Sequence, residues 1–183
     1  MTLVLGACAA DEIVLGAESK TSVVVVSGET VVSTSSQLDR KLFKLDRVGI
    51  ATYGSGPPNV RVPQVLDAEL RPAWSVDETV NFLKLRFTAA GADMGALVGG
   101  WDAQGNAILL DVRMDGYVQR MLPQLGHALP PLARRGVVYD AVAQQPPGTA
   151  ASILAQMLEL LTAACAGCPQ DAGPPFEFLV IPR

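Results

Sequence analysis

The stretch of sequence that decides the fold is MTLVLGACAADEIVLGAE, residues 1–18. It contains two apolar segments separated by a short polar turn at residues 10–12, and this pattern predicts two strands joined in a tight hairpin. The two ends of such a hairpin lie side by side. We therefore expect Thr2, near the start, to lie next to Glu18, at the far end, which places a hydroxyl group beside a carboxylate.

Removal of Met1 would make Thr2 chemically distinctive, and a small second residue normally permits that removal. The free α-amine of Thr2 would have a pKa of roughly 7.7–8.0, and it could act as the base that activates the neighbouring hydroxyl. The sequence contains a single histidine, His127. A Ser/His/Asp triad would have to be built around that one residue, whereas the terminal amine needs no histidine.

Two further segments extend the pattern beyond the hairpin: KLFKLD at residues 41–46 and GIATYG at residues 49–54. The threonine, the acid, the lysine segment and the glycine segment, in this order, resemble the β-type subunits of proteasomes and the related bacterial HslV peptidase. These proteins are N-terminal nucleophile hydrolases. The resemblance is strongest over residues 1–56, and a Gly-Trp-Asp turn followed by Asp111 continues it more weakly to about residue 120.

The resemblance implies a role for each matched residue. Thr2 would be the nucleophile, Glu18 would orient Lys41, and the Lys41 ammonium would lower the proton affinity of the amine and hydroxyl of Thr2. The backbone N–H of Gly54 would complete an oxyanion hole, and one such donor typically lowers the barrier by about 2.7–4 kcal/mol. Three further residues are implied to line the substrate cleft or the floor of its first pocket: Lys20, Ser22 and Thr52.

The sequence departs from the family pattern at supporting positions. A Ser/Gly-rich turn near the nucleophile's amine is replaced by Leu-Gly-His-Ala, so that His127 is either a polar partner of Thr2 or an ordinary structural histidine. Before the last strand the family has an Asp and a Ser, and here Asp171 stands without a serine. An insertion of about eight residues also separates Glu18 from Lys41, and we expect it to extend a hairpin outward. Loss of supporting contacts can leave a site poorly held.

The composition indicates one domain, residues 1–183, which we interpret as proteasome-like. Apolar residues make up 49% of the chain, charged residues 17%, and the net charge is −4. A chain with this apolar content is expected to bury part of its surface in an oligomer. Its net negative charge argues against a nucleic-acid partner. Apolar runs are too short for a membrane span and no basic secretory leader is present, so we expect a cytoplasmic protein without a membrane partner.

The cysteines and the single histidine argue against redox and metal chemistry. Three cysteines do not form a disulfide framework, and Cys8 is expected to be a small core residue on a strand. Cys165 and Cys168 have C-x-x-C spacing, but they follow an apolar helix, whereas redox motifs use the start of a helix to stabilise a thiolate. With one histidine there is no second ligand cluster for zinc. We predict no metal and no cofactor.

The remaining periodicity predicts three helices and several strands. One helix is expected over residues 59–73, one after a capping box at residues 75–78, and one after an N-cap at Thr149. Leu158 is expected on the apolar face of this last helix. Residues 133–147 predict a short helix or an irregular connection. The predicted strands cover residues 22–27, 30–35, 94–101, 106–113, 117–121 and 176–181. This order and the resemblance imply an α+β fold, a four-layer αββα sandwich of two antiparallel sheets flanked by helices.

The predicted function is that of a threonine-type N-terminal nucleophile peptidase. By the resemblance it would cleave peptides or unfolded proteins inside a self-assembled homo-oligomeric ring, with an ATPase as a candidate partner. Two alternatives stay open: a non-catalytic proteasome-like assembly or binding subunit, and a small-molecule amidase of the same nucleophile class. The missing supporting residues favour the first alternative, and a retained Met1 would favour it too, because Thr2 would then have no free amine.

Overall fold

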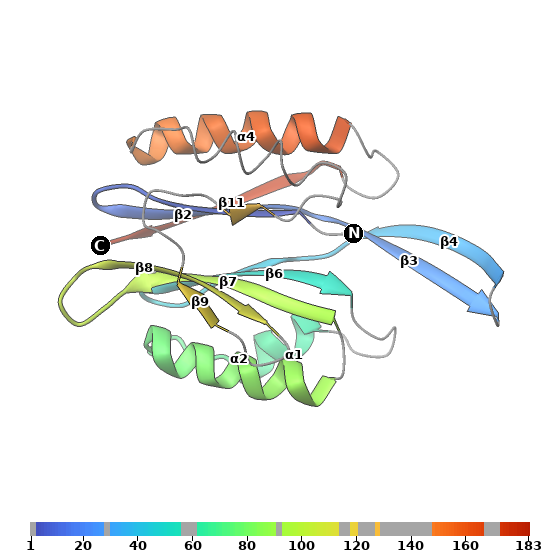
Figure 1. Ribbon diagram of the computed structural model, residues 1–183, viewed down its shortest axis with the longest axis horizontal. Coiled ribbons are helices and arrows are strands. Elements are labelled where there is room, and N and C mark those ends of the chain that lie inside the picture. Colours follow the sequence, from blue (N-terminus) through green and yellow to red (C-terminus); the bar gives the residue numbers. More distant parts are fainter. Residues whose placement is uncertain are drawn as a thin grey trace.

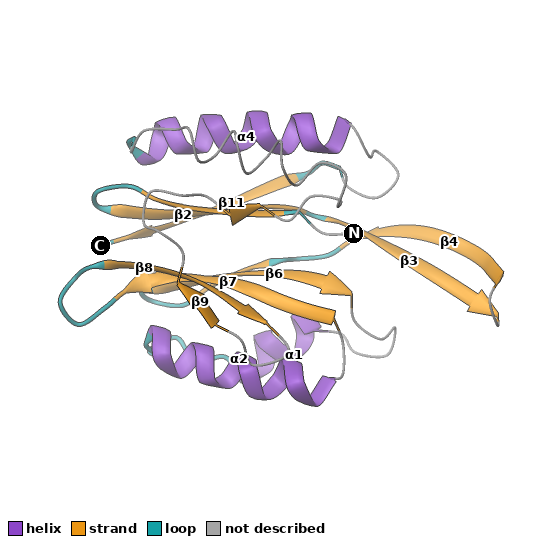
Figure 2. Cartoon of the chain, viewed as in Figure 1, coloured by secondary structure: helices purple, strands orange, loops and turns teal. Residues whose placement is uncertain are grey.

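A computed structural model describes residues 3–27, 30–55, 62–90, 93–113, 118–120, 127–128, 148–166 and 173–183. This part of the chain forms two larger antiparallel sheets, a separate two-stranded sheet and three helices (Figures 1 and 2). The four-stranded sheet has the order β10-β1-β2-β11, and the five-stranded sheet has the order β5-β6-β7-β8-β9. The predicted mixture of helices with two antiparallel sheets is confirmed.

The four-stranded sheet is built around the N-terminal hairpin. In that hairpin Val4 pairs with Ala17, and the N–H of Glu18 donates to the carbonyl of Leu3 at 3.2 Å. The strands of this sheet are β1 (Val4–Cys8), β2 (Glu12–Glu18), β10 (His127–Ala128) and β11 (Phe176–Pro182). The hairpin predicted from the first residues and the predicted last strand are both confirmed.

The five-stranded sheet packs against the first sheet through a shared apolar core. Leu15 and Val4 of the hairpin meet Leu97 and Leu109 of the second sheet in this core. A Cβ added at Gly49 would lie 2.5 Å from Cδ1 of Ile181 on β11, so the two sheets approach closely at that glycine. The strands are β5 (Leu42–Lys44), β6 (Val48–Ser55), β7 (Asp93–Trp101), β8 (Ala107–Arg113) and β9 (Val118–Arg120).

Helices cover the face of each large sheet that points away from the other sheet (Figure 1). α4 (Ala150–Ala166) packs on β2 and β11, and α2 (Val76–Ala90) packs on β7 and β8. α1 (Val62–Glu69) lies beside α2, and its Leu66 enters the same core. Within the described residues, none of the helices is long and apolar enough to span a membrane.

Two sequence predictions about the helices need correction. The helix expected to reach residue 73 ends at Glu69, because Pro72 restricts the residue before it and cannot continue a helix. On the last helix, Leu158 was expected on the buried face, but it is 46% exposed. The unassigned stretch at residues 133–147 and Cys168 lie outside the described residues. Cys8 is buried on β1 as predicted, and burial raises the pKa of its thiol to about 11.

The segment between Glu18 and Lys41, in which the insertion was predicted, forms a hairpin that projects beyond the two large sheets (Figure 1). Its strands are β3 (Lys20–Ser27) and β4 (Thr30–Leu38), which pair only with each other among the described strands. Ser27 pairs with Thr30, at the adjoining ends of the two predicted strands. The prediction that the insertion extends outward is therefore confirmed, and it leaves the two ends of the hairpin close to the first sheet.

The capping box at the start of α2 forms as predicted. The N–H of Glu78 donates to Oγ of Ser75 at 3.3 Å, and the N–H of Ser75 donates to Oε2 of Glu78 at 2.8 Å. Two backbone donors of the first turn are thereby satisfied reciprocally. The predicted cap at Thr149 also forms, since its Oγ1 accepts from the N–H of Ser152 at 3.3 Å.

Replacing Ser75 by alanine is expected to lower the free energy of unfolding by about 1 kcal/mol, because the cap of α2 is lost. Urea denaturation should show a lower midpoint at an unchanged slope. Ser75→Asp, which keeps a capping oxygen, should retain most of the stability. An equal loss in both variants would contradict the capping explanation.

Candidate functional site

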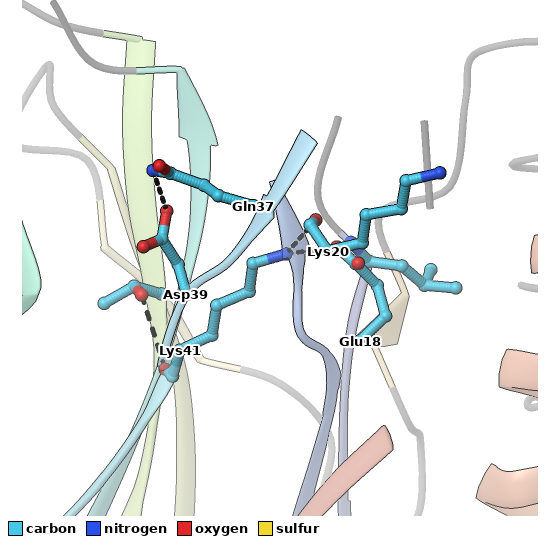
Figure 3. A network of polar contacts seen from close by, with 7 residues as sticks. Glu18, Lys20, Gln37, Asp39 and Lys41 are labelled. Atoms are coloured by element: carbon cyan, nitrogen blue, oxygen red, sulfur yellow. Dashed lines mark hydrogen bonds and ion pairs between the residues drawn. The ribbon is translucent and has the colours of Figure 1, made fainter. Parts of the chain in front are cut away.

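A buried ion pair joins two residues that are far apart in the sequence. Glu18 ends β2 and Lys41 directly precedes β5. Nζ of Lys41 forms an ion pair with Oε1 of Glu18 and donates a hydrogen bond to the carbonyl of Lys20 at 2.8 Å (Figure 3). The exposed fractions of the two side chains are 6% for Lys41 and 0% for Glu18. The predicted partnership of these two residues is thus present in the geometry.

The protonation of Lys41 reflects opposing effects. Burial lowers the pKa of the Lys41 ammonium, and the adjacent Glu18 carboxylate acts in the opposite direction. Removing two charges from water costs several kcal/mol per ion before their attraction is counted. Such a pair is therefore weak evidence for stability, and a buried amine with a lowered pKa beside a specific charge is a candidate for a functional site.

The carboxylate of Glu18 also contacts the start of the chain. Its Oε1 accepts a hydrogen bond from the N–H of Leu3 at 3.2 Å. Its Oε2 is buried and has no hydrogen-bond partner within the described part of the chain. Thr2 itself lies outside the described residues, so the structure brings Glu18 and Lys41 to the residue that directly follows the proposed nucleophile.

β6 approaches the ion pair through Thr52. Its backbone N–H donates to the carbonyl of Lys41 at 2.9 Å, and its Oγ1 donates to the same oxygen at 3.3 Å. Thr52 is buried, and its hydroxyl is hydrogen-bonded to the backbone of Lys41. Two residues further on, Gly54 has a φ of 101°, a conformation that glycine adopts readily and other residues rarely do.

The other predicted site residues are placed less completely. The carbonyl of Lys20 accepts from Lys41, and the Lys20 side chain extends away from the ion pair (Figure 3). Ser22 lies on β3, opposite Ser36. His127 lies on β10, opposite Gly6 of β1. For Ser22 and His127 the structure describes the backbone only, and Asp171 lies outside the described residues.

Two neighbours of the ion pair were not predicted from the sequence. Ser19 connects the residue before β11 with the residue after β4 through its backbone. Its N–H donates to the carbonyl of Pro175 at 3.0 Å, and its carbonyl accepts from the N–H of Asp39 at 2.8 Å. The Asp39 carboxylate is close enough to help keep Lys41 protonated, and it accepts from Nε2 of Gln37 at 3.0 Å (Figure 3). The sequence signal that could have identified Ser19 and Asp39 was their position close to Glu18 and Lys41.

The described residues offer no arrangement of three or more His, Cys, Asp or Glu side chains that could hold a metal ion. The chemistry available here is that of an ammonium and a carboxylate beside the N-terminal segment. A buried ammonium can stabilise a neighbouring amine in its neutral form, and thereby keep that amine available as a base.

Comparison with known proteins identifies the fold. No protein-family model matches the sequence, and no curated protein matches it either. Among solved structures, Anbu (ancestral beta-subunit) from Yersinia bercovieri matches with a TM-score of 0.69 and 14% identity, over 99% of this chain and 82% of that one. A mutant of Anbu from Hyphomicrobium sp. strain MC1 matches with a TM-score of 0.72 and 11% identity, over 100% and 82% of the two chains.

This chain shares its fold with Anbu. At such low identity the likeness establishes the fold alone, and it corrects the family expected from the sequence. The pattern from Thr2 to Gly54 predicted a proteasome β-type subunit or an HslV-like peptidase, whereas these structural neighbours are Anbu proteins, a proteasome-like but distinct family. The prediction was wrong at this level because the hairpin, the acid, the lysine and the glycine strand mark a proteasome-like fold without separating the families that share it.

Proposed function

We propose that this protein is an N-terminal nucleophile hydrolase of the threonine type that cleaves peptide bonds. The observation that carries the proposal is the buried contact between Glu18 and Lys41, with Glu18 also bound to the backbone of Leu3. An ammonium held beside the first residues of the chain suits a reaction in which Thr2 supplies both nucleophile and base. Burying both charged groups costs free energy. The proposed reaction gives a reason for that burial, whereas a purely structural ion pair could lie at the surface.

In the proposed reaction the α-amine of Thr2 accepts the proton of its own hydroxyl, whose oxygen then attacks the peptide carbonyl. Lys41 keeps that amine neutral through its positive charge, and Glu18 holds the ammonium in place. The amine returns the proton to the leaving nitrogen, and an acyl-enzyme ester remains. A water molecule deprotonated by the same amine hydrolyses the ester and releases the acid.

The backbone of β6 supports Gly54 as the oxyanion donor. The N–H of Thr52 points toward Lys41, away from β7. Alternate N–H groups along a strand point toward the same edge, so the N–H of Gly54 is expected to point toward this edge as well. β5 pairs with β6 only from Gly49 to Ala51. In the proposal an N–H beyond that point, which β5 does not pair, donates to the substrate carbonyl, as an oxyanion hole requires.

The proposal extends to the fold and its assembly. We take residues 1–183 as one domain with the four-layer αββα arrangement of N-terminal nucleophile hydrolases. The structural neighbours are described as beta-subunits, and the chain is 49% apolar, which supports a homo-oligomeric ring that encloses the site. Peptides or unfolded proteins would be the substrates, an ATPase the partner that delivers them, and the cytoplasm the location.

The proposal is tested by intact mass spectrometry of the purified protein before and after exposure to a peptide epoxyketone. This reagent reacts with an N-terminal threonine through both the hydroxyl and the amine. We expect a mass that lacks Met1 and a single adduct after exposure. A Thr2→Ala variant, treated identically, should show no adduct, because the hydroxyl is absent while the amine is retained.

The alternative functions correspond to other outcomes of this test. A retained Met1 with no adduct would contradict the peptidase proposal and favour a non-catalytic assembly or binding subunit. An adduct together with hydrolysis of small amides but of no peptide, in a protein that stays monomeric, would favour an amidase of the same nucleophile class. An adduct that forms equally in Thr2→Ala would show that another residue reacts.

A further inference from the structure

A buried polar network lies on the strand that carries Thr52 and Gly54, outside the ion pair described above. The hydroxyl of Tyr53 on β6 donates to Oδ1 of Asp111 on β8. The other carboxylate oxygen, Oδ2, accepts from Nε of Arg113 at 2.9 Å and from Nη2 of Arg113 at 2.8 Å. The Asp111 side chain is completely buried, whereas that of Arg113 is 45% exposed.

A glycine on the intervening strand makes room for this contact. Tyr53 pairs with Gly95 of β7, and Gly95 pairs with Arg113 of β8. A Cβ on Gly95 would lie 2.2 Å from Cζ and 2.3 Å from the hydroxyl oxygen of Tyr53. The tyrosine ring therefore crosses β7 directly over Gly95, and the network spans three adjacent strands.

The charges of the network are mutually satisfied. Burial, followed by the hydrogen bond to Asp111, raises the pKa of Tyr53, so its hydroxyl stays a donor. The hydrogen bond to Asp111 raises the pKa of Arg113, so the guanidinium stays charged. Both carboxylate oxygens of the buried Asp111 thus have donors, as a buried charge requires. A network of this kind rigidifies the elements that it joins.

We propose that Tyr53, Asp111 and Arg113 are positioning residues that fix the end of β6 and thereby the backbone N–H of Gly54. The inference rests on the function proposed above, in which that N–H stabilises the oxyanion. Tyr53 is the residue between Thr52, which binds the backbone of Lys41, and Gly54, which has the positive φ. The side chain of Tyr53 is anchored on β8, so its hydroxyl restrains the stretch of β6 that β5 does not cover.

The test compares Tyr53→Phe with the wild type by two measurements. In hydrogen exchange followed by mass spectrometry, the segment containing Gly54 should exchange about tenfold faster in the variant, because the ring remains and only the anchoring hydroxyl is lost. With a peptide substrate, kcat should fall by roughly 10-fold to 100-fold, since a small misplacement of a catalytic group has an effect of this size, while KM should change by less than about twofold.

Two further variants keep the test independent of folding. Asp111→Ala removes the acceptor from the β8 side and should reproduce both effects. The double variant with Tyr53→Phe should be no worse than Asp111→Ala alone, because the contact between the two side chains is already lost. Ser75→Ala serves as the control, since it lowers stability at the start of α2, which packs near the Val48 end of β6 and away from its Gly54 end. It should change neither the exchange of the Gly54 segment nor kcat.

The outcomes separate this inference from the proposed function. Unchanged exchange at the Gly54 segment in both Tyr53→Phe and Asp111→Ala would overturn the positioning role, whatever the activity. Faster exchange with an unchanged kcat would overturn its connection to catalysis. Absence of an epoxyketone adduct in the wild type would instead remove the proposed function, and the exchange measurement would still decide whether the network holds Gly54.

Discussion

Replacing Thr2 by alanine is expected to reduce peptide hydrolysis by at least about 10⁴-fold, while the proposed oligomer stays intact. The variant keeps the terminal amine and the Glu18–Lys41 pair but has no hydroxyl to form the acyl-enzyme. Loss of a catalytic nucleophile has effects of about this size in serine peptidases. The measurement is kcat/KM with a fluorogenic peptide, together with the mass of the assembly by light scattering.

Thr2→Ser is the matched control, because it retains both the hydroxyl and the amine and removes one methyl group. It should keep a readily measured rate and form an epoxyketone adduct. An unchanged rate in Thr2→Ala would remove Thr2 from the mechanism. A loss of activity that accompanies dissociation of the assembly would attribute the effect of the substitution to structure instead of chemistry.

Replacing Lys41 by methionine is expected to lower the free energy of unfolding by about 3–5 kcal/mol, because a fully buried Glu18 carboxylate then lacks its counter-charge. A domain of this kind has roughly 5–15 kcal/mol in total, so the variant should unfold at a markedly lower urea concentration. In the proposed mechanism the same substitution removes the ammonium that keeps the Thr2 amine neutral, so hydrolysis should be lost under conditions in which the variant is folded.

The double variant Glu18→Gln with Lys41→Met tests the reason for this loss. Removing both charges leaves no unpaired carboxylate, so most of the stability should return, while activity should stay absent. Asp67→Asn serves as a control for an exposed pair: Asp67 and its partner Arg40 are 52% and 53% exposed, and the cost should be below about 1 kcal/mol. Equal losses in the single and double variants would contradict the buried-charge argument.

Local sequence patterns predicted the secondary structure well where the physical cause is local. The N-terminal hairpin follows from two apolar segments and a polar turn, and α2 begins at its capping box because Ser75 and Glu78 satisfy each other's backbone donors. The same patterns misplaced the end of α1 and the exposure of Leu158. The first error arises because Pro72 ends the helix earlier than the apolar periodicity indicates, and the second because periodicity does not show how wide the buried face of a helix is.

The sequence predicted the contact of Glu18 with Lys41, but not the backbone contact that also holds Lys41. The order of Thr2, Glu18, Lys41 and Gly54 indicated their roles by resemblance, but it did not distinguish Anbu from the proteasome β subunits and HslV. The contact of Lys41 with the carbonyl of Lys20 had no signal in the sequence. A contact made by residues outside the family pattern can be identified only from the three-dimensional structure.

The sequence by itself predicted most of the strands, the caps and the residue types on which the proposed N-terminal nucleophile chemistry depends, because turns, helix starts and strand alternation depend on neighbours along the chain. The tertiary structure alone decided which charges are buried together, that Gly54 has a φ of 101°, and that Tyr53 crosses Gly95 to reach Asp111. These features depend on how two sheets and their strands register against one another. Their energies come from desolvation and packing between segments far apart in the sequence, which no local pattern records.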